Sequence, residues 1–301
     1  MLSRIAASIC IIALLAAPAL AQPATGPNAT GDTSADTVTL GTTLPAVGST
    51  TTFVRKSNLS VKVRVTMEDP ATKKDMLLQE ITQEVTGEAE AAITVLEHAD
   101  GKVSKVQVKV VKHKQVSTNN GMAMDGETFG DRAYVATRKG NDVIIIGPDG
   151  TTPTGTEHAF VYAFADTMLN GNPWTNALPK RALKVGESFD IPKEAANRQM
   201  AEVKIDGLKL KLAGVSTVDG KRQAEFEISA KANVTPQPGM NVGFEIGGKI
   251  VVDAASGQAL KTSTAGPVTV TGGSDTPNGK MTISGSGKAD ETSSMVIKKP
   301  E

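Results

Sequence analysis

The chain has 301 residues, with 32 basic and 32 acidic side chains and few aromatic rings. Proteins that bind nucleic acid or anionic lipid through charge carry an excess of Lys and Arg, which this composition lacks. The scarcity of aromatic rings argues against a sugar-binding surface and requires a core made of aliphatic side chains. A chain of this length suffices for one large β domain or two smaller ones.

The first residues predict a secretory signal peptide. Arg4 supplies a positive charge, an apolar run covers residues 5–15, and Ala21 followed by Gln22 completes a cleavage site of the A-x-A type. We expect removal of residues 1–21, which places the mature protein in the periplasm or outside a bacterial-type cell. The apolar run is shorter than the roughly 20 residues that span a bilayer, so we expect no transmembrane segment after cleavage.

The mature chain is expected to contain no thiol, because Cys10 is the only cysteine and lies within the signal peptide. A disulfide, a cysteine nucleophile and a thiolate metal site are therefore not expected. Residues 22–43 are mostly Ala, Thr, Gly, Pro and Asp, a composition that buries too little apolar surface to order itself and predicts a flexible leader. The β domain is expected over residues 44–301.

Alternating apolar and polar side chains predict antiparallel strands. The apolar members of three such runs are Leu59, Val61, Val63, Val65 and Met67, then Val106, Val108 and Val110, then Ala224, Phe226, Ile228 and Ala230. Turn signals separate the runs, at Asp100-Gly101, Gly140-Asn141-Asp142, Asp149-Gly150, Asp219-Gly220 and Ser256-Gly257. The apolar phase changes at Asp206-Gly207, which predicts a bulge or a tight turn at that point.

One principal helix is predicted at about residues 156–169. Thr154 and Glu157 have the spacing of a capping box, apolar residues follow at helical spacing, and Asn170-Gly171 is typical of a helix end. A second helical turn is predicted over residues 194–200.

We predict an all-β, mainly antiparallel fold: a strongly curved sheet or open half-barrel with one principal helix. Two related lobes, residues 44–153 and 178–301, are expected on either side of a helical segment at residues 154–177. The expectation of relatedness rests on similar segments around Leu44-Pro45 and Leu178-Pro179.

The sequence shows no catalytic or metal-binding constellation. The three histidines, His98, His113 and His158, have no partner at metal-ligand spacing, so solvated or structural roles are predicted. No cofactor and no metal are expected. Acidic residues near turns are expected to be solvated, because no calcium-loop pattern contains them.

The aromatic residues are concentrated in one segment: Phe160, Tyr162, Phe164 and Trp174 lie within 15 positions. One interpretation is that the helix plugs the concave face of the curved sheet and that the rings are core. The other is that they line a groove for an apolar ligand or a partner, roofed by the helix. The first is favoured, because large aromatic side chains mostly serve packing.

Two segments carry a family resemblance. Residues 178–189, from Leu-Pro to Val-Gly-Glu-Ser-Phe, and the strand and turn over 248–257 resemble an uncharacterised family of exported bacterial β-rich proteins. That family has no established activity, so the resemblance implies a compartment and a fold type. In outline, the expected architecture is also similar to the half-barrels of bacterial lipoprotein carriers, which hold acyl chains on the concave side.

These observations predict an exported envelope protein with a non-catalytic binding or scaffold role, whose partner is another envelope protein or an apolar small molecule. The alternative is a carrier of a lipid or other apolar ligand under the central helix, with Phe160, Tyr162, Phe164 and Trp174 as binding residues. A second alternative is a hydrolase whose carboxylate pair is brought together only by the fold.

Overall fold

The computed structural model describes residues 36–41, 43–140, 142–170, 178–197, 203–277 and 279–298. The predicted signal peptide with Ala21 and Gln22 lies outside the described residues, as does Trp174. The elements of the described ranges are, in chain order, β1 (Thr37–Val38), β2 (Thr50–Glu68), β3 (Asp75–Ala99), β4 (Lys102–Asn119), β5 (Met122–Lys139), β6 (Asp142–Ile146), α2 (Gly155–Leu169), β7 (Leu183–Lys184), β8 (Ser188–Asp190), α4 (Lys193–Asn197), β9 (Val203–Val218), β10 (Lys221–Gln237), β11 (Met240–Asp253), β12 (Ala259–Thr276) and β13 (Gly279–Lys298).

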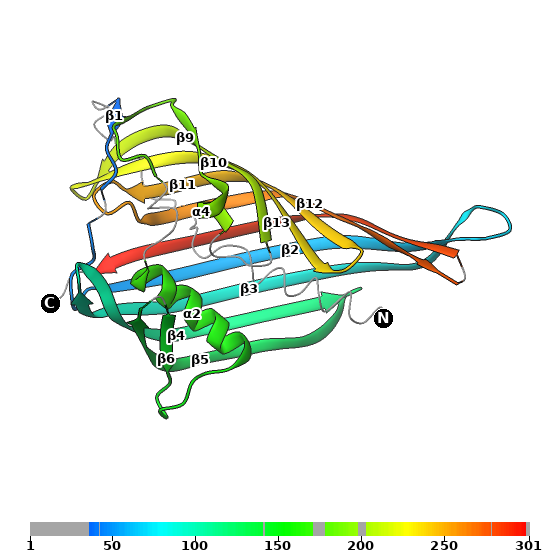
Figure 1. The fold of residues 1–301 in the computed structure, drawn as a ribbon, viewed down its shortest axis with the longest axis horizontal. Coiled ribbons are helices and arrows are strands. Elements are labelled where there is room, and N and C mark those ends of the chain that lie inside the picture. The colour runs from blue at the N-terminus through cyan, green and yellow to red at the C-terminus, as the bar shows by residue number, and fades with distance from the viewer. Residues whose placement is uncertain are drawn as a thin grey trace.

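One antiparallel sheet of 11 strands forms the body of the molecule. Its order is β6-β5-β4-β3-β2-β13-β12-β11-β10-β9-β8, and β1 pairs separately with β7. The edges β6 and β8 do not pair with each other, so the sheet is open (Figure 1). The predicted fold class, an all-β protein with a curved open sheet and one principal helix, is confirmed.

The chain runs outwards from the centre of the sheet and then returns to it. Strands β2 to β6 follow one another to one edge, the chain crosses through α2 to the opposite edge, and β8 to β13 lead back. Strand β13 pairs with β2 from Thr50, opposite Lys298, to Met67, opposite Met281. The first and last long strands of the sheet therefore join its two halves. We call β2–β6 the N-terminal lobe and β8–β13 the C-terminal lobe.

The two faces of the sheet differ because every long strand alternates. On β2, Leu59 and Val61 are buried whereas Lys62 is exposed. We call the buried face, on which both helices lie, the inner face. Opposite charges pair across neighbouring strands on the outer face, at Lys62–Glu80, Lys211–Glu227, Lys231–Glu245 and Lys249–Glu225. Such exposed pairs contribute little free energy, but they keep this face in water.

Tight turns and bulges fall at predicted positions. Asp100-Gly101 joins β3 to β4 and Asp219-Gly220 joins β9 to β10, with all four residues at positive φ, as a two-residue hairpin requires. The predicted change of phase at Asp206 is a bulge, because Ile205 and Gly207 pair with consecutive residues of β10. The bulge lets both parts of β9 direct their aliphatic side chains to the inner face.

Two glycines permit the curvature near the centre of the sheet. A Cβ atom on Gly266 of β12 would lie 1.6 Å from the carbonyl oxygen of Glu245, and one on Gly287 of β13 would lie 2.0 Å from that of Ser60. Neighbouring backbones approach too closely at these points for any side chain. Strongly coiled sheets need such positions where one strand bends over the next.

Helix α2 is the predicted central helix, but its capping box does not form. Thr154 is the N-cap residue, yet its side chain makes no capping hydrogen bond. The Glu157 carboxylate instead accepts hydrogen bonds from Arg132, at 2.9 Å, and from the Tyr134 hydroxyl. Because both donors belong to β5, Glu157 ties the start of the helix to the sheet. Burial and the Glu157 hydrogen bond raise the pKa of Tyr134 to about 12.

The predicted second helical turn is present as α4, which starts at Lys193. It lies over β9, where Ala196 joins the buried cluster of the C-terminal lobe. Residues 198–200, the end of that prediction, lie outside the described residues.

Residues 36–41, which we call the strap, correct the boundary of the predicted leader. Val38 and Leu40 are buried in the cluster of the C-terminal lobe, and the amide of Gly41 donates to the Ala254 carbonyl at 2.7 Å. The composition of residues 22–43 indicated flexibility, but two alternating aliphatic side chains at its end are enough to cover the end of this lobe. Packed structure therefore begins before residue 44.

Candidate functional site

Two of the aromatic side chains singled out from the sequence point into the molecule. Phe164 is buried, and its ring centroid lies 4.7 Å from that of Phe53 on β2. Phe160 lies 4.8 Å from Phe164 and 5.5 Å from Phe129 of β5, in edge-on contacts. Such edge-to-face contacts are a favourable arrangement for aromatic rings. The rings fill the space between α2 and the sheet, so this part of the inner face is packed core.

Tyr162 is not part of this cluster. Tyr162 is 38% exposed and stacks on His158 at 5.9 Å, on the side of the helix away from the sheet. Positions 160 and 164 share a helix face because they are four residues apart, whereas position 162 points away from it. Trp174 lies outside the described residues. The structure thus brings Phe160 and Phe164 together and separates Tyr162 from them.

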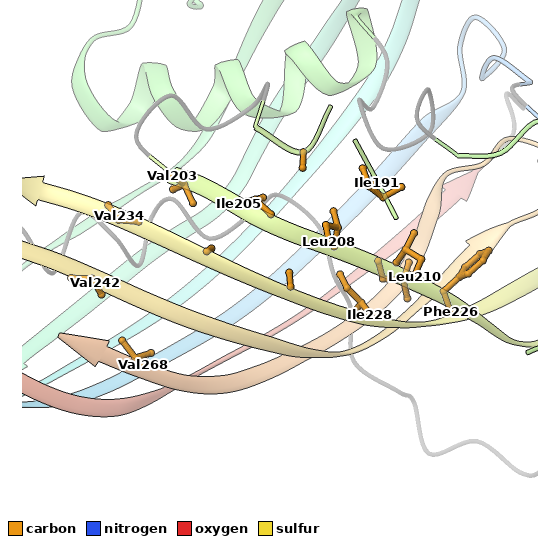
Figure 2. Packing of buried hydrophobic residues seen from close by; sticks show 14 of the residues in the cluster. Ile191, Val203, Ile205, Leu208, Leu210, Phe226, Ile228, Val234, Val242 and Val268 are labelled. Atoms are coloured by element: carbon orange, nitrogen blue, oxygen red, sulfur yellow. The ribbon is translucent and has the colours of Figure 1, made fainter. Parts of the chain in front are cut away.

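The two helices cover the flanks of the inner face. Helix α2 packs against β4, β5 and β6, and α4 packs against β9 (Figure 1). The inner sides of β2, β13 and β12 run between these flanks, and we call them the central strip. Leu59, Val61 and Val63 of the strip belong to one aliphatic cluster with the C-terminal lobe. Figure 2 shows the part of that cluster on the C-terminal lobe.

A polar band crosses the central strip. It consists of Arg55 and Ser57 on β2, Glu291 and Ser293 on β13, and Thr262 and Thr264 on β12. The register places them side by side: Ser293 is opposite both Arg55 and Thr262, and Glu291 is opposite both Ser57 and Thr264. All six belong to the inner face, because they share the alternation of Phe53 and Leu59.

An ion pair lies at the centre of the polar band. Arg55 Nη2 donates to Glu291 Oε2 at 2.9 Å, and the two side chains are 16% and 7% exposed. Burial raises the pKa of Glu291 to about 7, although the Arg55 guanidinium acts in the opposite direction. A buried ion pair is weak evidence for stability, because desolvation offsets the attraction. A buried carboxyl with a shifted pKa on an apolar face is a candidate binding group.

Buried polar atoms without a hydrogen-bond partner among the described residues gather on and beside the band. They are Glu291 Oε1, Thr262 Oγ1 and both ring nitrogens of His113, whereas Thr51 Oγ1, Asn119 Oδ1 and Gln258 Oε1 lie away from the band. A buried group left in this state costs about 1 to 3 kcal/mol, and such groups are normally satisfied by protein, ordered water or a bound molecule. Their concentration in one region indicates that a polar partner belongs there.

His113 extends this polar region into the N-terminal lobe. Its ring stacks on Phe129 at 4.4 Å and meets Phe160 at 4.8 Å. Burial lowers the pKa of His113; the negative charge of Glu127 opposes this effect, and the positive charge of Arg55 adds to it. The imidazole is therefore neutral at physiological pH and offers one donor and one acceptor.

Sequence reasoning did not place His113 in a site. A register shift between β3 and β4 reverses the alternation after Val110, so His113 lies on the inner face although Lys112 and Lys114 flank it. The adjacent Val110 and Val111, which break the strict alternation of β4, are the sequence signal for this shift. Arg55 and Glu291 carried no signal of their own, because their pairing joins the two ends of the chain.

The two ends of the central strip differ. Near the start of β2 the strap crosses towards the C-terminal lobe, where the Val185 amide donates to the Asp36 carbonyl at 2.9 Å. The other end carries a group of exposed apolar side chains, which we call the apolar tip. Its members are Met76, Leu77 and Leu78 of β3.

The remaining polar groups form no second centre. Within the described ranges, no group of three or more His, Cys, Asp or Glu side chains could hold a metal ion. His98 Nε2 is 3.0 Å from the Pro45 carbonyl oxygen at the surface. None of the helices in these ranges is long and apolar enough to cross a membrane.

No family model and no curated protein matches the sequence. A structure of lipovitellin, described in terms of lipid–protein interactions, is 8% identical with a TM-score of 0.41; the match covers 85% of this chain and 26% of the lipovitellin chain. An outer-membrane channel from Pseudomonas putida is 8% identical with a TM-score of 0.21, over 83% of this chain and 96% of its own. A dynemicin-biosynthesis protein of Micromonospora chersina is 10% identical with a TM-score of 0.17, over 90% and 91%. At these scores the likenesses carry no functional argument.

Proposed function

We propose that this protein is a non-catalytic binding protein of the bacterial envelope that holds an apolar or amphipathic molecule along its central strip. The observation that carries the proposal is the aliphatic cluster of the inner face, which extends from the C-terminal lobe onto Leu59, Val61 and Val63 of β2 while α2 and α4 pack on the flanks of the sheet. Only one face of the sheet is suited to this role, because the outer face carries paired charges.

The dimensions of the strip suit an acyl chain. The inner side chains of β2 are apolar from Leu59 to Met67, a distance of about 27 Å at the rise of a β-strand. One leaflet of a bilayer core is about 15 Å thick, so a single acyl chain fits within this length. The sequence suggested a ligand under the central helix. The ligand is proposed here to lie beside α2, because Phe53, Phe160 and Phe164 fill the space beneath the helix.

Export and the lack of catalysis belong to the same proposal. The predicted signal peptide supports a place in the periplasm or outside the cell, where apolar molecules need a protein to carry or sequester them. The hydrolase alternative stays a prediction. The ion pair of Arg55 and Glu291 is suited to holding a ligand, because each charged group already has a partner of opposite sign.

The first experiment is native mass spectrometry of the mature protein, released from the periplasm without detergent, followed by identification of any bound molecule. We expect a stoichiometric apolar or amphipathic molecule. The stripped protein should then bind the apolar dye N-phenyl-1-naphthylamine with an increase in fluorescence. Replacing Val63 by Asp should abolish dye binding, whereas Arg64→Asp on the outer face should not. An apo mass together with no dye binding would refute the proposal.

The apolar tip favours a second candidate function, docking to another envelope protein. Three consecutive large apolar side chains, Met76, Leu77 and Leu78, remain exposed at this end of the sheet, more than isolated surface residues would explain. A photo-crosslinking amino acid at Leu77 should then capture one discrete partner in living cells. The same crosslinker at Thr271, on the outer face of β12, is the control. Equal crosslinking from both positions would contradict docking at the tip.

A further inference from the structure

We propose that the polar band recognises the head group of an amphiphile, and that this head group is uncharged and hydrogen-bonding, such as a hydroxyl or an amide. This inference rests on the proposed function and adds to it the class of ligand. In this arrangement the apolar tail lies along the central strip, and the head meets Glu291 and Thr262.

The polar atoms on which the inference rests share one region of the inner face. Glu291, Thr262 and His113 are each at least nine-tenths buried, and each has an atom without a hydrogen-bond partner among the described residues. Thr262 is opposite Ser293, two residues from Glu291 on the neighbouring strand β13, and His113 lies in the row of Arg55. Adjacent strands are about 4.8 Å apart, so one small polar group can reach both Glu291 and Thr262.

The charges of the band favour a neutral head. Arg55 and Glu291 neutralise each other through their 2.9 Å contact, so the band offers a ligand no net charge. An anionic head would meet the Glu291 carboxyl, and a cationic head would meet the Arg55 guanidinium, each with little water to screen it. A hydroxyl or an amide both donates and accepts, which matches the Thr262 hydroxyl, the second carboxyl oxygen of Glu291 and the neutral imidazole.

The surroundings of the band set the direction of the tail. Towards the strap, Phe53 of β2 and Met295 of β13 stand next to the band, and Phe164 packs on Phe53. Towards the apolar tip, the inner positions of β2 are Leu59, Val61 and Val63, while β13 contributes only Ala289, Gly287 and Gly285. Leu59, Val61 and Val63 therefore supply the aliphatic contacts for the tail on the side of the tip. The head therefore lies deep in the molecule and the tail extends towards the apolar tip.

The test uses the stripped mature protein and three amphiphiles with the same oleoyl or oleyl chain: 1-monooleoylglycerol, oleate and oleylamine. Each is titrated against bound N-phenyl-1-naphthylamine at pH 8 and low protein concentration. We expect monooleoylglycerol to displace the dye at a concentration at least tenfold lower than either charged analogue. Thr262→Val should weaken the binding of monooleoylglycerol about tenfold without weakening that of the charged analogues. Thr271→Val, on the outer face of the same strand, should leave the binding of all three amphiphiles unchanged.

Replacing Glu291 by Gln gives the sharpest result. This variant removes the negative charge that faces Arg55, so the preference should shift from monooleoylglycerol to oleate, a reversal that a purely structural role would not produce. If Glu291→Gln does not fold, the Thr262→Val comparison decides alone. Dye binding with equal displacement by all three amphiphiles, or tightest binding of a charged one to the wild type, would overturn the head-group inference alone. Absence of dye binding would overturn the proposed function itself.

Discussion

The two lobes begin with the same turn, and they differ in what covers their inner faces. Gly48 precedes β2 with φ 81°, and its amide donates to the Val95 carbonyl at 2.8 Å. Gly186 precedes β8 with φ 86°, and its amide donates to the Leu212 carbonyl at 2.7 Å. In both turns the carbonyl of the residue after the glycine accepts a hydrogen bond from the amide of that same strand residue, Val95 or Leu212. The relationship between the halves stays a prediction.

The inner faces of the two lobes differ in how they are packed. In the N-terminal lobe the 15-residue helix α2 inserts Phe160 and Phe164 against Phe53, Phe129 and His113. In the C-terminal lobe α4 has only five residues, and the inner face is mainly aliphatic. One lobe therefore supplies an aromatic core and the other supplies the wider apolar surface. The polar band lies where the two meet.

The largest expected effect breaks the aromatic core of the N-terminal lobe. Phe164→Ala removes a buried ring and should lower the free energy of unfolding by roughly 3 to 5 kcal/mol, because a cavity remains. Tyr162→Ala, on the exposed side of the same helix, should change it by no more than about 0.5 kcal/mol. Urea denaturation followed by circular dichroism measures both. Equal losses would contradict the assignment of Phe164 to the core and Tyr162 to the surface.

The next prediction concerns the junction of the lobes. The folded-state pKa of Glu291, about 7, lies above the ordinary value of 4.5, so the native state binds this proton more tightly than the unfolded state. Stability is therefore lost as the pH rises from about 4.5 through 7, by about 3 kcal/mol in total. The wild type should lose this amount relative to Glu291→Gln between pH 4.5 and pH 8 in urea titrations. If the free energies of unfolding of the two proteins change in parallel with pH, the raised pKa of Glu291 is contradicted.

A smaller effect tests whether the two opening turns are equivalent. Gly48→Ala and Gly186→Ala each force a side chain into the left-handed region and should each cost about 1 to 2 kcal/mol. Gly207→Ala is the control, because its φ is not positive and a Cβ there has open space. Thermal or urea unfolding measures the three. A cost at only one turn would show that the two turns are not energetically equivalent.

The smallest effect concerns the start of α2. Thr154→Ala should change the free energy of unfolding by less than about 0.5 kcal/mol, because the Thr154 side chain makes no capping hydrogen bond. Glu157→Gln should cost more, since it weakens the contacts with Arg132 and Tyr134 that tie the helix to β5. Urea denaturation compares the two. If Thr154→Ala lowers the free energy of unfolding by about 1 kcal/mol, the Thr154 side chain does form a capping hydrogen bond.

Much of the fold could be predicted from local patterns. The alternation after Leu59, the turns at Asp100-Gly101 and Asp219-Gly220, the bulge at Asp206 and the central helix all depend on residues close in sequence. The strap was missed because composition averages over residues 22–43 and hides Val38 and Leu40. The capping box was wrong because Arg132 and Tyr134, distant in sequence, compete for the Glu157 carboxylate.

The candidate site was predicted only in part. The aromatic cluster was recognised, and the preference for core over a ligand groove at Phe160 and Phe164 agrees with their packing. The polar band was not recognised, because Arg55 and Glu291 look like ordinary surface charges in their own segments. His113 was assigned a solvated or structural role, since its neighbours are lysines and the shift that turns it inwards depends on pairing with β3.

The sequence by itself determined which side chains of each strand share a face, where the chain turns and where its one long helix lies. These features follow from the two-residue period of strands, the steric freedom of glycine and the spacing of a helix, all of which act over a few residues. Only the tertiary structure decided that β13 returns beside β2. That pairing places Arg55 against Glu291 in a buried band, because long-range pairing is chosen by the packing of the whole sheet.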